Sequence, residues 1–136
     1  MAGMSGLSEI GVRVVAETGN AIPLLHEIAA LLEILARDGK GGSIDLGSMP
    51  MLPGDRAILE EVLGQGEVNA EIDALGPSRI RETAIRGVWW VTHCNAEGET
   101  VADLIEVARV PAILVTPVED VGDGLQSLRD RLADRR

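Results

Sequence analysis

The sequence contains no phenylalanine and no tyrosine, and its two aromatic side chains, Trp89 and Trp90, are adjacent. The core of this 136-residue chain must therefore come from aliphatic side chains, which are plentiful because 46% of the residues are hydrophobic. A chain of this length can bury such a core without help from a metal ion or a disulfide. We therefore expect a single domain over residues 1–136, with residues 1–8, rich in Gly, Met and Ser, loosely held.

Cysteine is equally scarce, because Cys94 is the only one in the chain. It excludes an internal disulfide, and no second cysteine or third ligand stands at the spacing of a zinc site. His26-Glu27 begins an H-E-x-x-H pattern, but Ala30 occupies the position of the second histidine. Residues 39–43, GKGGS, also lack the spacing of a phosphate-binding loop. The sequence therefore predicts no bound cofactor and no metal.

The sequence also has few basic residues and no long apolar run. The 22 acidic and 12 basic side chains give a formal net charge of −10, which repels nucleic acid and anionic membrane surfaces. No run approaches the ~20 consecutive apolar residues that a membrane-spanning helix needs, and the first residues lack the pattern of a signal peptide. We therefore expect a soluble cytoplasmic protein that binds no nucleic acid and does not insert into membranes.

Helical signals occur in three segments. The clearest helix follows Asn20, a favourable cap residue, and ends before Gly39. A second helix is expected over residues 54–64. The third begins with acidic residues and ends with arginines, as the helix dipole favours. Its apolar residues recur at helical spacing: Val121, Leu125, Leu128 and Leu132.

Strand signals dominate the middle of the chain. Residues 67–75 alternate between apolar and polar side chains, residues 79–94 predict a long strand or a bent pair, and residues 100–109 follow a hairpin loop. Short strands are expected near residues 43–46 and over residues 10–17. This order predicts an α+β fold in which two to three helices cover one face of an antiparallel sheet. The sheet is expected to be a three-strand meander plus one or two short strands.

The adjacent tryptophans pose a packing problem. Neighbouring residues of a strand point to opposite faces of the sheet, so Trp89 and Trp90 cannot enter the same core. Either both faces are covered, or a bulge at Gly87 rotates one ring, or one ring belongs to a binding surface. We favour Trp89 as the exposed ring because it shares parity with Arg79 and Arg81, although a bulge at Gly87 reverses that choice.

Arg79 and Arg81 share one strand face and admit two interpretations. They can form a solvated strand edge that pairs with Glu71 or Asp73, an arrangement that adds little stability in water. Alternatively, they can anchor a carboxylate or a peptide terminus, which an arginine guanidinium suits better than a lysine ammonium. Both interpretations stay open at this stage.

His93 and Cys94 are neighbours on the same expected strand. Because they point to opposite faces, they are not expected to bind a metal together. We interpret Cys94 as a small buried apolar residue. The functional alternative is a small thiol-dependent enzyme, or a redox or metal-handling factor, in which His93 assists the Cys94 thiol.

One long stretch carries a family resemblance. Residues 66–93, GEVNAEIDALGPSRIRETAIRGVWWVTH, and residues 98–114, GETVADLIEVARVPAIL, resemble the conserved region of the HupH/HyaF-type hydrogenase expression proteins. The match is closest over residues 66–114, and its most specific parts are the run GPSRIRET and the pair Trp89-Trp90. Members of this family are often longer than this chain, which is similar to a single-domain form.

The resemblance implies an accessory role in the maturation of nickel–iron uptake hydrogenases, as an assembly factor or chaperone and not as an enzyme. The implied partner is the iron–sulfur small subunit precursor or another maturation protein, and a homodimer is compatible with this role. The resemblance supplies no catalytic residue. The candidates for partner contact lie in the same stretch: Arg79, Arg81, Glu82, Arg86, Trp89, Trp90 and His93.

The charge of the chain adds one hypothesis about this partner. The family resemblance implies a small subunit precursor with a twin-arginine leader, and a chain of net charge −10 would attract such a basic segment. Equal affinity for leader-containing and leaderless precursor, at low and at high salt, would contradict this hypothesis.

Overall fold

The computed structural model describes residues 15–73 and 75–135. Its helices are α2 (Ala21–Asp38), α3 (Pro53–Leu63) and α4 (Val118–Ala133), with the 3₁₀ turns η1 (Leu46–Ser48) and η2 (Ala112–Leu114). Its strands are β1 (Gly42–Asp45), β2 (Asn69–Asp73), β3 (Pro77–Glu82), β4 (Val88–Cys94) and β5 (Thr100–Val107). None of the helices in this part of the chain is long and apolar enough to cross a membrane.

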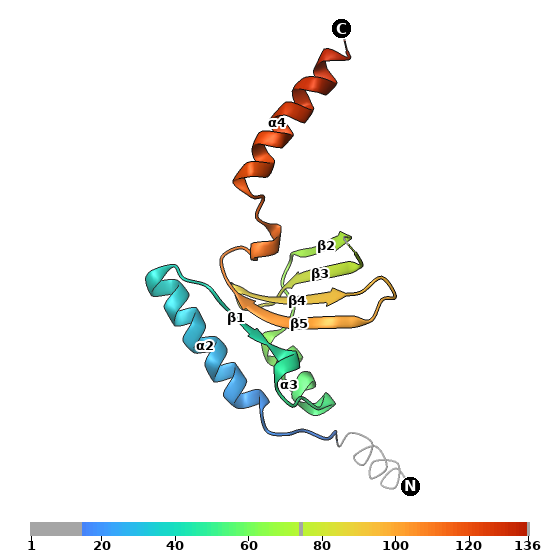
Figure 1. Ribbon diagram of the computed structural model, residues 1–136. Helices are drawn as coiled ribbons and strands as arrows, with labels where there is room; N and C mark the ends of the chain where they lie inside the picture. The colour runs from blue at the N-terminus through green and yellow to red at the C-terminus, as the bar shows by residue number, and fades with distance from the viewer. Residues whose placement is uncertain (1–14, 74, 136) are drawn as a thin grey trace.

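The strands form one antiparallel sheet in the order β1-β5-β4-β3-β2 (Figure 1). Strands β2 to β5 follow one another as a meander, and β1 pairs with the free side of β5, with Ile44 opposite Ile105. The α+β prediction is therefore confirmed. The meander has four strands rather than three, because residues 79–94 form parts of β3 and β4, separated by a turn over residues 83–87.

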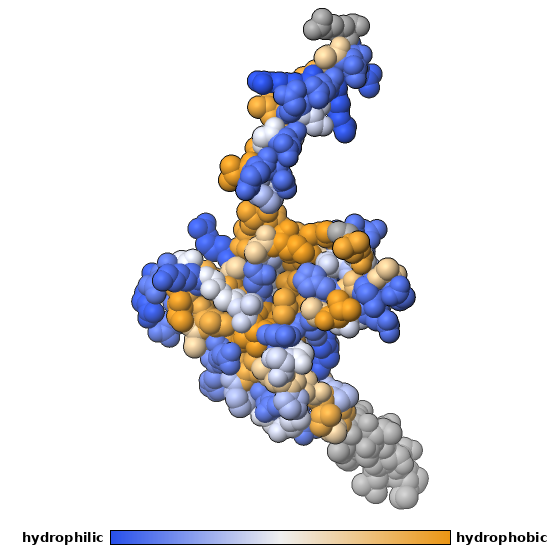
Figure 2. All heavy atoms as spheres, in the orientation of Figure 1, coloured by the Kyte–Doolittle hydropathy of each residue, from blue (hydrophilic) through white to orange (hydrophobic). Residues whose placement is uncertain are grey.

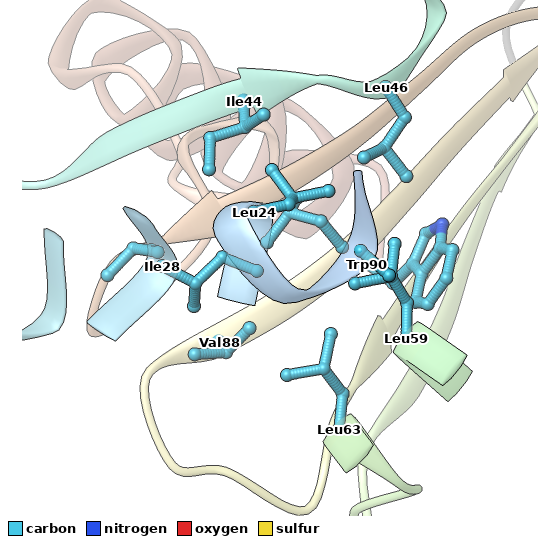
Figure 3. Packing of buried hydrophobic residues seen from close by; sticks show 11 residues of the cluster. Leu24, Ile28, Ile44, Leu46, Leu59, Leu63, Val88 and Trp90 are labelled. Carbon is cyan, nitrogen blue, oxygen red and sulfur yellow. The ribbon is translucent and has the colours of Figure 1, made fainter. Parts of the chain in front are cut away.

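The first face of the sheet packs against α2 and α3 and holds the larger hydrophobic core (Figure 3). Its fully buried members come from both helices, from η1 and from three strands: Ala21, Leu24, Ile28, Ile44, Leu46, Leu59, Leu63, Val88, Trp90, Ile105 and Val107. At ~25 cal/mol per Å² of apolar surface removed from water, this layer is the main source of stability. The helices α2 and α3 are therefore held on one face of the sheet.

The ends of α2 agree only in part with the expected signals. Gly39 follows the helix in the left-handed conformation, with a φ of 74°, and its N–H donates to the Leu35 carbonyl oxygen. Asn20 precedes the helix as expected, but its side chain makes no capping hydrogen bond. Instead, the Asn20 amide donates to the Pro50 carbonyl oxygen at 2.9 Å, which ties the start of α2 to the loop before α3.

The opposite face of the sheet carries a smaller apolar cluster of Ile80, Trp89 and Val91. The partly buried side chains packed against this cluster are Ala70, Ile72, Leu104 and Leu114. Of these, only Leu114 comes from outside the sheet, since it belongs to η2. Both faces of the sheet therefore hold apolar side chains, although the helices that pack on it, α2 and α3, lie on the first face.

The helix α4 projects away from the sheet (Figure 1). It contributes no buried residue, although its apolar residues have the helical spacing expected from the sequence. Their exposed fractions run from 50% to 85%: Val118, Val121, Leu125, Leu128 and Leu132. Figure 2 shows hydrophobic side chains along one side of this helix, outside the folded domain.

Hydrogen bonds attach the segment before α2 to the first turn of α3. The short strand expected over residues 10–17 lies mostly outside the described residues, as does the segment 1–8, and residues 15–17 belong to no strand. Asp55 in α3 accepts hydrogen bonds from the Thr18 N–H at 3.0 Å, the Thr18 hydroxyl at 2.8 Å and the Leu52 N–H at 2.9 Å. The backbone at Gly54 lies so close to residue 16 that a Cβ there would be 2.6 Å from the Ala16 carbonyl oxygen. Only glycine fits at this position without a shift of the backbone.

Asp55 makes the stability of this junction dependent on pH. Burial tends to raise its pKa, but hydrogen bonds from Leu52, Thr18 and Gly19 oppose this and hold the pKa below its ordinary value. A carboxyl group with a lowered folded-state pKa stabilises the fold above its unfolded-state pKa, and this stabilisation is lost as the pH falls through the folded-state value. We expect Asp55→Asn to unfold at lower urea concentration at pH 7, with a difference from wild type that shrinks below pH ~4.

The measurement is urea denaturation at pH 7 and at a pH below ~4, with unfolding followed by tryptophan fluorescence. Glu61→Gln is the control, because Glu61 is an exposed residue of the same helix. A difference between Asp55→Asn and wild type that does not depend on pH would contradict this assignment.

Candidate functional site

Trp90 lies at the centre of a buried polar network on the first face of the sheet. Its indole Nε1 donates to Asp103 Oδ1 at 2.8 Å, and the Thr92 hydroxyl donates to the same oxygen at 3.0 Å. Arg56 from α3 forms an ion pair with Asp103 at 2.6 Å. The Arg56 and Arg81 guanidinium groups lie over the indole, 5.0 and 4.7 Å from the ring centroid. Trp90 is therefore a structural residue that two arginines and one carboxylate hold in place.

Arg81 completes this network through α3. It pairs with Glu60 at 3.0 Å, so the expected partners Glu71 and Asp73 are wrong for this arginine. Arg79 lies opposite Glu71 in the register of β2 and β3, and no ion pair of Arg79 is present among the described residues. Of the two arginines of β3, Arg81 therefore attaches the sheet to α3.

The expected exposure of Trp89 is wrong. Its exposed fraction is only 8%, and its Nε1 donates to the Ala108 carbonyl oxygen at 3.0 Å. The turn over residues 83–87 reverses the chain, so that Arg81 lies opposite Trp90 in the register and the parity argument fails. The two indoles do point to opposite faces, as strand alternation requires, and each face supplies its own cluster.

Trp89 nevertheless lies at the edge of a depression of about 530 Å³ at the end of the sheet. We call this depression the Trp89 groove. It is lined by residues of α2, of the end of β3, of the turn before β4, of β4 itself and of the segment after β5: Leu32, Leu35, Ala36, Glu82, Arg86, Gly87, Trp89 and Arg109. The groove therefore combines apolar side chains with two guanidinium groups and one carboxylate.

The charges of the Trp89 groove differ from those of the chain as a whole. Arg86 and Arg109 are exposed, and neither forms an ion pair with any other residue in the described ranges. The Glu82 carboxylate accepts a hydrogen bond from the Glu67 N–H at 3.0 Å, so part of its acceptor capacity is already used. In a chain of net charge −10, this groove offers two free guanidinium groups beside an apolar floor. Such a site fits an apolar segment that carries a carboxylate.

The structure distributes the seven candidate residues over different places. Glu82, Arg86 and Trp89 meet in the Trp89 groove. Trp90 belongs to the network on the first face, and Arg81 both joins that network and lines, with Arg79, a second depression beside β2.

His93 lies outside the Trp89 groove, where its Nδ1 is 2.7 Å from the Ser78 hydroxyl. His93 and Cys94 do not form a thiol–imidazole pair, because no hydrogen bond between them is present in the described part of the chain. Cys94 is half-buried rather than fully buried, and the sheet register shifts between these two residues. Across residues 15–73 and 75–135, no three His, Cys, Asp or Glu side chains are grouped to hold a metal ion.

The groove includes residues that sequence reasoning did not select. Leu32 and Leu35 are partly buried residues of α2 that also pack against the larger core. Arg109 stands at the end of an expected strand, where no local pattern marks it. The turn at Gly87 brings these residues together: a Cβ there would lie 3.2 Å from Leu32 Cδ2, and Gly87 O accepts from the Ala108 N–H at 2.9 Å.

The described residues thus form an α+β domain with two helices on one face of a five-stranded sheet and a basic, apolar groove at its end. Residues 18–134 match the family model of the HupH hydrogenase expression protein, C-terminal conserved region. The chain belongs to this family, which confirms the resemblance found in the sequence.

Individual relatives agree with the family assignment. The chain is 33% identical over 116 residues to the hydrogenase expression/formation protein HoxQ of Azotobacter vinelandii, covering 82% of this chain and 40% of that protein. It is 34% identical over 112 residues to the hydrogenase expression/formation protein HupH of Rhizobium leguminosarum bv. viciae, covering 82% of this chain and 39% of that protein. The chain therefore spans about two fifths of the length of these relatives.

A solved structure shows the same fold. The hydrogenase expression protein HupH from Thiobacillus denitrificans ATCC 25259 is 44% identical to this chain, with a TM-score of 0.83. The match covers 88% of this chain and 99% of that one.

Proposed function

We propose that this chain is an accessory protein for the maturation of a nickel–iron uptake hydrogenase. In this role it binds the iron–sulfur small subunit or its precursor, as a chaperone does. The observation that carries the proposal is the family membership, since the relatives that match 82% of the chain are named hydrogenase expression/formation proteins.

The proposed contact surface for the client is the Trp89 groove. Of the seven candidate residues from the sequence, it retains Glu82, Arg86 and Trp89. Arg86 and Arg109 supply guanidinium groups without ion-pair partners among the described residues, and arginine is enriched at the residues that dominate binding energy. Leu32 and Leu35 supply apolar surface in the same groove as Trp89. The client segment that fits this groove has an apolar side chain next to a carboxylate, either of a side chain or of a chain terminus.

Capture of the client from cells tests this contact. In cells that express the hydrogenase operon, the tagged wild-type chain is expected to retain the small subunit precursor in a pull-down. The double variant Arg86→Glu/Arg109→Glu is expected to lose most of it, because two attractive charges become repulsive toward the client carboxylate. The matched control is Lys40→Glu/Arg135→Glu, which changes the net charge equally at exposed residues that do not line the groove.

The control distinguishes loss of binding at the groove from an effect of the net charge of the whole chain. If both double variants retain the precursor as well as wild type does, the groove is not the contact. If neither variant nor wild type retains it, the client assignment itself is wrong. Circular dichroism of each variant shows whether the fold is preserved.

A further inference from the structure

Leu75, between β2 and β3, is exposed and has an unfavourable backbone conformation. Its side chain is 97% exposed, which is the largest exposed fraction among the large hydrophobic residues that the structure describes. Its φ of 58° is the only positive φ of a non-glycine residue in the described ranges. Glycine and asparagine adopt this left-handed conformation more readily than leucine does. Packing within the chain therefore gives no reason for a leucine at this position, where another molecule can contact it.

Acidic residues accompany Leu75 at this end of the sheet. Asp73, the last residue of β2, is exposed and stands two residues before it. Glu97 is an exposed residue of the connection between β4 and β5, which lies at the same end of the sheet (Figure 1). The two connections are in contact, because a Cβ at Gly76 would lie 2.5 Å from the Asn95 carbonyl carbon. We call Asp73, Leu75 and Glu97 the Leu75 tip, which presents one apolar side chain with carboxylates.

The Trp89 groove has the complementary composition. Its floor is apolar, and Arg86 and Arg109 form no ion pair with any residue that the structure describes. Neither Asp73 nor Glu97 forms an ion pair within the same ranges. The groove fits an apolar segment that carries a carboxylate, and the Leu75 tip is such a segment in the chain itself.

The Leu75 tip and the Trp89 groove lie at opposite ends of the sheet. The strand β3 begins at Pro77, beside the tip, and ends at Glu82, which lines the groove. Its six residues span about 20 Å at ~3.3 Å per residue. A tip therefore cannot enter the groove of its own chain, and only the groove of another copy is within its reach.

From this complementarity, we infer that the Leu75 tip of one copy docks into the Trp89 groove of another copy. Leu75 packs on the apolar floor, and the carboxylates of the tip pair with Arg86 and Arg109. The contact joins two different surfaces, so the copies associate head to tail and each pair keeps one tip and one groove free for further copies.

The docking regulates access to the groove. The contact rests on one leucine and a few ion pairs, so it is smaller than a stable interface, and its dissociation constant is on the order of 0.1–1 mM. A client that binds the same groove more tightly displaces the tip. The inference shares the groove with the proposed function, but it needs no client to be tested.

Sedimentation equilibrium of the purified chain from about 20 μM to about 1 mM tests the docking. The mean mass of the wild type is expected to rise with concentration. The tip variant Leu75→Asn/Asp73→Asn and the groove variant Arg86→Glu/Arg109→Glu are each expected to stay monomeric. In an equimolar mixture, the intact tip of the groove variant meets the intact groove of the tip variant. Such a mixture is expected to form pairs and nothing larger, because the second tip and the second groove are both altered.

Nuclear magnetic resonance locates the contact in the same samples. The chain has only two indole N–H groups, and the Trp89 Nε1–H signal is expected to shift as the wild type associates. The tip variant is expected to unfold at the same urea concentration as wild type or a higher one, because asparagine tolerates the left-handed conformation. Its loss of association is therefore not a loss of fold.

Three results would overturn the inference. The first is a wild type that stays monomeric at about 1 mM, well above the expected dissociation constant. The second is association that persists in the tip variant, which would assign the contact to another segment, such as the start of α4. The third is association without a shift of the Trp89 Nε1–H signal, which would exclude the groove. None of these results bears on the client, whose binding is measured separately.

Discussion

Replacement of Trp90 by alanine is expected to lower the free energy of unfolding by ~3–5 kcal/mol. The indole is 1% exposed and is packed among residues of α2, α3 and the sheet, so its removal leaves a large cavity in the main core. The change also takes a hydrogen-bond donor from Asp103, which is 9% exposed, and the stacking surface from Arg56 and Arg81. A loss of this size is comparable with the whole stability of many small domains.

The matched variant Trp90→Phe separates the two contributions. It keeps most of the apolar volume but removes the Nε1 donor, so a smaller loss of ~1–3 kcal/mol is expected, because the buried Asp103 loses one of its three hydrogen-bond donors and keeps only Thr92 and Arg56. Urea denaturation followed by far-UV circular dichroism measures both values. If Trp90→Ala costs less than ~1 kcal/mol, Trp90 is not the structural centre that its contacts indicate.

Gly76→Ala is expected to produce the second large effect, a loss of more than ~2 kcal/mol in the free energy of unfolding. Gly76 precedes β3 and has a φ of 125°, a conformation that side chains other than glycine rarely adopt. An added Cβ would also meet the Cys94 carbonyl oxygen and lie 2.5 Å from the Asn95 carbonyl carbon, both of them backbone atoms. The backbone of the β4–β5 connection must therefore move to admit a methyl group.

Gly98→Ala is the control for the conformational part of this effect. Gly98 also has a positive φ, 84°, but a Cβ there would meet nothing within 4 Å. Its replacement is expected to cost only the ~1 kcal/mol of the unfavourable backbone conformation. Equal losses for the two variants in urea denaturation would show that the steric contact at Gly76 does not matter.

Local patterns in the sequence predicted most of the secondary structure. Gly39 ends α2 because it adopts the left-handed conformation, and the alternation of residues 67–75 predicted β2. Parity along residues 79–94 failed, because the turn over residues 83–87 separates two strands and its length sets the register between them. The side chain that faces Arg81 is therefore decided by the turn, which alternation cannot reveal.

The sequence also did not predict where α4 lies relative to the sheet. The helix forms where its spacing and charges predicted, but an amphipathic pattern does not specify the partner of its apolar side. The amphipathic α2 packs on the sheet, whereas α4 projects from it. Apolar residues at helical spacing in both segments therefore did not show which helix would lie against the sheet.

The candidate site was predicted in part. Glu82, Arg86 and Trp89 lie together in the groove because Arg86 belongs to the turn that joins β3, which ends at Glu82, to β4, which contains Trp89. Arg109 and the residues of α2 join them only through the sheet order, since β5 ends beside the start of β4 and α2 crosses the same end. A site assembled from three distant segments leaves no common pattern in the sequence.

The affinity of the purified chain for the purified small subunit precursor tests the central claim most directly. Isothermal titration of wild type is expected to show binding, and Arg86→Glu/Arg109→Glu is expected to weaken it at least tenfold, or by ~1.4 kcal/mol. The control Lys40→Glu/Arg135→Glu is expected to bind within a few-fold of wild type. No binding by a folded wild-type chain would contradict the proposed client, and equal affinities of the three proteins would contradict the groove as its contact.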